Sequence, residues 1–170
     1  VAAPGVETLN IESDDSATTT TAIAHSISIQ DSSAKSLTIT GDAGLAVTYS
    51  DGTALTNVNA SGMSRVYASA SATSSAGLDW ATLPTFAAAA TITAGAGDDK
   101  IGYTANATTA SLSIDGGAGA DTIYGGAGND TITDTSSTVT NPITGAVTAA
   151  GNKLYGNAGN DTITAGDGAD

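Results

Sequence analysis

The chain has 170 residues, of which 17 are acidic and four are basic, so its formal net charge is −13, and it has no cysteine. This charge repels nucleic-acid phosphates and anionic lipid, so cations are expected partners and nucleic acid is not. Without cysteine the chain has neither disulfides nor thiol chemistry, and no apolar run is long enough to span a membrane.

Short segments with an apolar residue at every second position predict strands throughout the first half. They cover residues 7–11, 26–29, 36–40, 45–49, 55–60 and 65–70. This is the period of a strand with one buried face, and no segment shows the period of a helix. The segments start roughly ten residues apart, which suits either a sandwich of hairpins or a parallel β-helix with two strands per coil. We favour the β-helix, because the second half is more regular still.

Residues 71–90 interrupt this pattern and hold the chain's single Trp and single Phe, Trp80 and Phe86. We expect an irregular excursion that packs over a face or an edge of the solenoid. Aromatic side chains usually supply buried apolar area, so Trp80 is expected to fill the core rather than to bind a ligand.

A nine-residue repeat with the pattern G-G-x-G-x-D-x-U-x, where U is a large apolar residue, begins at residue 94. Its units are 94–102, 116–124, 125–133, 156–164 and 165–170. The last unit stops before its strand residues, so we expect a segment truncated from a longer protein. Small residues at positions 1, 2 and 4 suit a turn with positive φ. Position 8 is Ile101, Ile123, Ile132 or Ile163, which we expect to point inward as a narrow core ladder.

Every unit has an aspartate at position 6, namely Asp99, Asp121, Asp130, Asp161 and Asp170. Because nine residues make half a coil, an aspartate one full coil later returns to the same edge, about 4.8 Å away. If residues 134–150 form an inserted loop, Asp130 and Asp161 share one edge and the other three aspartates share the opposite edge.

Carboxylates stacked this closely repel one another, so the repeat predicts a bound cation. Hard carboxylate and carbonyl oxygens suit Ca²⁺, whereas Mg²⁺ demands a smaller octahedral site. Zn²⁺ is disfavoured because it prefers Cys and His ligands, and the chain has no Cys and only one His, His25. The alternative is that Asp merely favours turns, but Asn or Ser would serve a turn as well. Asp134, which lies just outside the motif, is expected to contribute little.

Residues 94–170 resemble the RTX calcium-binding repeats. The resemblance implies a β-roll in which carbonyl groups at positions 1 to 4 and the position-6 carboxylate bind Ca²⁺ between adjacent coils. Besides the five aspartates, it implicates Gly95, Gly97, Gly116, Gly117, Ala118, Gly119, Gly125, Gly126, Ala127, Gly128, Gly156, Asn157, Ala158, Gly159, Gly166 and Gly168. The expected fold is all-β, a right-handed parallel β-solenoid over residues 1–93 that continues into this β-roll over residues 94–170.

The first half, in "GVETLNIES" and "AKSLTITGDAGLAVTYSDGTALTNVNASGMS", resembles the threonine- and alanine-rich, calcium-binding surface-layer proteins of Gram-negative bacteria that carry RTX repeats. The resemblance implies a structural protein that is secreted by type I secretion and forms an extracellular lattice on the bacterial surface. Its implied partners are calcium, copies of itself and cell-surface polysaccharide. The alternatives are the repeat region of a secreted RTX protease or lipase, and the stalk of a large RTX adhesin. No G-x-S-x-G or H-E-x-x-H motif is present, so we expect no enzymatic activity.

Overall fold

The computed structural model describes residues 5–14, 24–51, 53–64, 76–102, 108–134, 138–140, 147–149, 151–166, 168 and 170. The regular structure in these residues consists of β-strands alone. None of them forms a helix with the length and apolarity that a membrane crossing requires.

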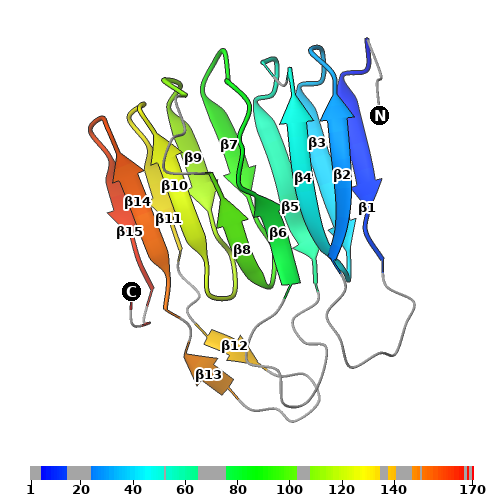
Figure 1. The fold of residues 1–170 in the computed structure, drawn as a ribbon. Helices are drawn as coiled ribbons and strands as arrows, with labels where there is room; N and C mark the ends of the chain where they lie inside the picture. The colour runs from blue at the N-terminus through cyan, green and yellow to red at the C-terminus, as the bar shows by residue number, and fades with distance from the viewer. Residues whose placement is uncertain are drawn as a thin grey trace.

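Two sheets lie against each other and run the length of the molecule (Figure 1). The seven-stranded sheet has the order β1 (Thr8–Glu12), β3 (Ser36–Gly41), β5 (Asn57–Met63), β7 (Ala90–Thr93), β9 (Leu112–Asp115), β11 (Thr131–Thr133) and β15 (Thr162–Thr164). The six-stranded sheet has the order β2 (Ala24–Gln30), β4 (Gly44–Ser50), β6 (Ala76–Trp80), β8 (Asp98–Ile101), β10 (Thr122–Gly126) and β14 (Lys153–Asn157).

Successive strands alternate between the two sheets, so each coil contributes one strand to each sheet. The described pairings within both sheets are all parallel. Parallel neighbours cannot be joined by tight hairpins, so the chain must cross to the other sheet before it returns. The predicted parallel β-helix with two strands per coil is therefore confirmed, and the hairpin sandwich is wrong.

The core between the sheets is built from ladders of apolar side chains that stack in register. In the seven-stranded sheet one ladder joins Leu37, Val58, Ile92, Ile114 and Ile132, all of them buried. The alternation of side chains along each strand sends these residues inward and their neighbours outward. The period-two pattern of the sequence therefore explains both the strands and their orientation.

The isoleucines at position 8 follow this rule with one exception. Ile101, Ile123 and Ile132 are fully buried, as predicted. Ile163 stands in register with Ile132 on the same face, as predicted, but it is 45% exposed and so is not buried like the others. It lies on β15, the last strand of its sheet, and no further strand covers it.

The excursion predicted at residues 71–90 is wrong for its central part. Residues 76–80 form β6, which pairs with β4 and β8 inside the six-stranded sheet. Leu78 and Trp80 alternate inward and are fully buried, so Trp80 fills the core as expected. Residues 81–89 are the irregular connection to β7, while 71–75 and the strand predicted at 65–70 lie outside the described residues.

The segment inserted at about residues 134–150 contains an antiparallel hairpin. Its strands are β12 (Thr138–Thr140) and β13 (Val147–Ala149), which pair only with each other among the described strands. Figure 1 shows this hairpin below the lower edge of the two sheets, after which the chain re-enters the six-stranded sheet as β14. The sheets also continue across residue 93, because β7 pairs with both β5 and β9.

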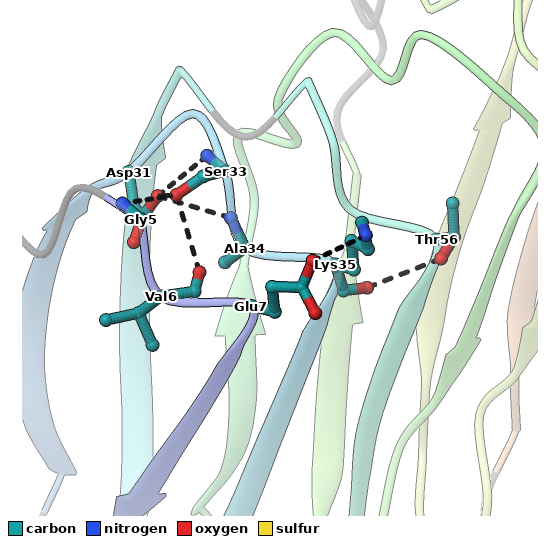
Figure 2. A network of polar contacts seen from close by, with 8 residues as sticks. All are labelled: Gly5, Val6, Glu7, Asp31, Ser33, Ala34, Lys35 and Thr56. Atoms are coloured by element: carbon teal, nitrogen blue, oxygen red, sulfur yellow. Dashed lines mark hydrogen bonds and ion pairs between the residues drawn. The ribbon is translucent and has the colours of Figure 1, made fainter.

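A side-chain turn closes the connection from β2 to β3 in the first half (Figure 2). Asp31 Oδ1 accepts hydrogen bonds from the N–H and the hydroxyl of Ser33, both at 2.7 Å, and from the N–H of Ala34 at 3.2 Å. The Ser33 hydroxyl, followed by its N–H, holds the pKa of Asp31 below the usual value. In this Asx turn a side chain closes the connection between two strands, whereas glycine-rich backbone closes the turns of the second half.

Candidate metal centre

The aspartates at position 6 form two hydrogen-bonded ladders, one on each edge of the roll. On one edge the Oδ1 atom of Asp121 accepts the N–H of Asp99 at 2.8 Å. On the other, Asp161 Oδ1 accepts the N–H of Asp130 at 2.9 Å, and Asp130 Oδ1 accepts the N–H of Leu112 at 2.8 Å. Each carboxylate thus reaches back to the coil before it, and the predicted sharing of edges is confirmed.

The second oxygen of these carboxylates is buried and faces a glycine. Neither Asp121 Oδ2 nor Asp130 Oδ2 receives a hydrogen bond from any described group. A Cβ on Gly125 would overlap Asp130 Oδ2 and would lie 3.0 Å from the carbonyl oxygen of Gly156, in the next coil. A carboxylate and a carbonyl of the adjacent turn therefore converge where a side chain would otherwise stand.

This convergence corrects the explanation of glycine at position 1. The described glycines at positive φ include Gly117 and Gly126 at position 2, and Gly119 and Gly159 at position 4, but none at position 1. At position 1 the requirement is space for the aspartate of the same unit, as at Gly125. Asn157 takes position 2 of its unit with φ of 71°, a region that Asn tolerates better than most residues.

The turns stack closely on one another from coil to coil. Ala118 donates its N–H to the carbonyl of Gly95 at 2.9 Å, and Ala158 donates to the carbonyl of Gly126 at 3.1 Å. A Cβ on Gly159 would overlap the carbonyl oxygen of Gly128. The backbone carbonyls of successive turns are thus brought together, as the stacking of units 125–130 and 156–161 requires.

Burial raises the pKa of the carboxyl groups in these turns. Asp99 is 2% exposed, and burial raises its pKa to about 7, against the opposing effect of the Leu78 N–H bond. Burial, followed by the charge of Asp99, raises the pKa of Asp121, and burial also raises that of Asp130. Buried charges of one sign are costly unless a counterion neutralises them.

A second ladder at position 5 was not foreseen from the sequence. Asp98 Oδ1 accepts the N–H of Ala120 at 3.1 Å, and Asn129 Oδ1 accepts the N–H of Asn160 at 2.9 Å. These bonds point toward the following coil, opposite to those at position 6. The signal available was the Asp or Asn that precedes the aspartate in the units 94–102, 125–133 and 156–164.

Asn152 and Asp134 also lie beside the Asp121 turn, although sequence reasoning left both outside the site. Asn152 Oδ1 accepts the N–H of Asp121 at 2.9 Å, and the N–H of Asn152 is accepted by Asp170 at 2.9 Å. Asn152 therefore takes the place of a position-6 aspartate, one coil before Asp170. Asp134, which was expected to contribute little, is 0% exposed and lies in the interior of the roll. The roles of Gly166 and Gly168 stay predictions.

The donors present fit a calcium ion. Paired turns offer carboxylate oxygens without hydrogen-bond partners among the described residues and carbonyls of the neighbouring coil, which are the hard oxygen ligands that Ca²⁺ takes. The described residues bring no three Asp, Glu, His or Cys side chains into the geometry of a metal centre. An ion in these turns would therefore need backbone carbonyls beside one or two carboxylates.

Comparison with known proteins agrees with this chemistry. Residues 113–133 and 148–170 match the family described as RTX calcium-binding nonapeptide repeat (4 copies). The searches of curated proteins and of solved structures gave no match to the chain. The matched segments include the turns of Asp121, Asp130, Asp161 and Asp170, whereas the unit at 94–102 lies outside them.

Proposed function

We propose that this chain, whose second half carries RTX calcium-binding repeats, is a structural segment of an extracellular protein that folds around calcium and assembles with its own copies into a surface layer. The RTX repeats bind Ca²⁺, and proteins that contain them are typically secreted. The role in a surface layer rests on the likeness of the first half to surface-layer proteins.

The observation that carries the calcium-dependent fold is the set of buried carboxylates at the turns. Asp121 and Asp130 each leave one buried oxygen without a hydrogen bond from the described residues. The core beside them is a ladder of single isoleucines, which offsets little of the entropy lost when the backbone becomes ordered. A divalent cation would neutralise the carboxylates and close the turns, so binding and folding become one process.

The same charge supports calcium-dependent association. The formal net charge of −13 keeps separate copies apart at low salt, and bound Ca²⁺ reduces that repulsion. We propose no enzymatic activity for the chain itself, because its sequence lacks the serine-nucleophile motif G-x-S-x-G and the zinc-protease motif H-E-x-x-H. The repeat region of a secreted enzyme and the stalk of an adhesin are the competing functions.

Electron microscopy and light scattering of the protein in millimolar Ca²⁺ and in chelator test this function. We expect ordered two-dimensional sheets in calcium and dispersed particles in chelator. Sheets that form equally well in chelator would contradict calcium-driven assembly. Monomers that bind calcium and never associate would favour the repeat region of an enzyme.

A further inference from the structure

The insertion interrupts one glycine turn of the roll. After β11 the chain leaves the sheets, forms the β12–β13 hairpin and returns at β14. The intervening sequence, residues 134–152, contains no G-G-x-G-x-D motif. This layer of the roll therefore lacks the aspartate that the nonapeptide units supply.

Asn152 replaces that aspartate in hydrogen bonding but not in charge. Its Oδ1 accepts the N–H of Asp121 at 2.9 Å, just as Asp121 accepts the N–H of Asp99 at 2.8 Å. Its Nδ2 is buried and has no hydrogen-bond partner among the described residues. An amide nitrogen cannot bind a cation, so the interrupted turn keeps the ladder and loses one ligand.

Asp134 brings a carboxylate to the same place from the other end of the insertion. It lies one coil after Gly116, and its N–H donates to the carbonyl of Thr164 at 2.9 Å. A Cβ on Gly116 would lie 2.8 Å from Asp134 Oδ2 and 2.7 Å from Asp121 Oδ2. Two fully buried carboxylates thus point at one position, and the Asp121 oxygen there receives no hydrogen bond from a described donor.

Two ionised carboxylates this close repel each other, so both stay ionised only where a cation lies between or beside them. The lysines of the adjoining strands, Lys100 and Lys153, are exposed and do not supply it. A cation held by the two carboxylates and by backbone carbonyls would let both groups stay ionised at this position.

We propose that Asp134 is a calcium ligand, and that it supplies, from position 1 of the interrupted turn, the carboxylate that Asn152 does not. The ion lies between this turn and the turn of Asp121. This inference rests on the proposed calcium-dependent fold and adds a ligand from outside the nonapeptide motif. The β12–β13 hairpin is then inserted between two halves of one metal site.

Native mass spectrometry and calcium titration calorimetry of the whole chain test the assignment. We expect Asp134→Asn to bind one Ca²⁺ fewer than the unsubstituted chain, or to bind that ion roughly 10- to 100-fold more weakly. Asp79→Asn is the matched control, because Asp79 is an exposed aspartate on β6 and should leave the count unchanged. The double variant Asp134→Asn with Asn152→Asp returns a carboxylate to the same turn and should recover the lost ion.

Equal counts and affinities for Asp134→Asn and the unsubstituted chain would overturn the inference, and would indicate that the two carboxyl groups share a proton instead. A double variant that does not regain the ion would also overturn it, since loss through misfolding would then explain the single variant. The proposed function fails in a different way, when the unsubstituted chain binds no calcium or when calcium does not order it.

Discussion

The substitution Asp130→Asn separates the carboxylate's charge from its hydrogen bond. Asn Oδ1 can still accept the N–H of Leu112, which now lies 2.8 Å from Asp130 Oδ1. The group that replaces Oδ2 is an NH₂ beside the carbonyl of Gly156, since both atoms converge on the position of a Gly125 Cβ. The ladder is therefore kept, while a charged ligand is replaced by a donor that repels Ca²⁺.

Two effects of opposite sign follow from Asp130→Asn. In calcium, removing one partner of a buried charge pair costs about 3 kcal/mol, or roughly a 100-fold loss of affinity at that site. In chelator, the variant should be at least as stable as the unsubstituted chain, because it no longer buries a carboxylate and its new NH₂ faces a carbonyl.

Calcium titration calorimetry measures the change in affinity. Urea unfolding in calcium and in chelator measures the change in stability under each condition. The control is Asp79→Asn, which changes the net charge equally at an exposed position. Unchanged affinity for calcium would refute the reasoning. A variant less stable than the unsubstituted chain in chelator would show that the charge stabilises the roll without a cation.

Three further predictions concern the core, the turns and the first half. Ile132→Ala should cost about 2–5 kcal/mol of unfolding free energy in calcium, because Ile132 is fully buried, whereas Ile163→Ala, at a residue 45% exposed, should cost about 1 kcal/mol in the same urea titration. Gly159→Ala should abolish cooperative calcium binding, measured by calorimetry, since Gly159 has φ of 125° and its new Cβ would overlap the backbone of the preceding coil. Asp31 has a pKa lowered by the Ser33 hydroxyl, so its stabilisation is present above the unfolded pKa of about 3.9 and is lost as pH falls through the lower folded pKa. Asp31→Asn should remove that acid-side loss from thermal melting curves, and identical pH profiles for the two proteins would contradict it.

The regular part of the fold could be predicted because its rules are local. Alternating apolar residues fix which face of each strand is buried, and the glycine-rich turn fixes where each coil reverses. A coil of two nonapeptides, once the extra residues between units are set aside as loops, then stacks Asp130 on Asp161 and Asp99 on Asp121, which the hydrogen bonds confirm. The strand at 76–80 was missed because only Leu78 and Trp80 show the pattern within a stretch of small and polar residues.

The interrupted turn could not be predicted by the same rules. An insertion hides which residue re-enters the ladder, because its length follows no repeat. Counting one coil back from Asp170 would have found Asn152, and counting one coil forward from Gly116 would have found Asp134. That these two residues converge with Asp121 depends on backbone geometry, which spacing alone does not give.

Hydrogen exchange of the whole chain, followed by mass spectrometry in calcium and in chelator, tests the coupling of calcium binding and folding most directly. The amides of Asp99, Asp121 and Asp130 donate to the carboxylate and amide oxygens of the ladders, so they report the turns themselves. The account predicts that peptides from residues 112–164 are protected in calcium and exchange freely in chelator, while those from 36–63 stay protected in both. Equal protection of residues 112–164 in calcium and in chelator would contradict it.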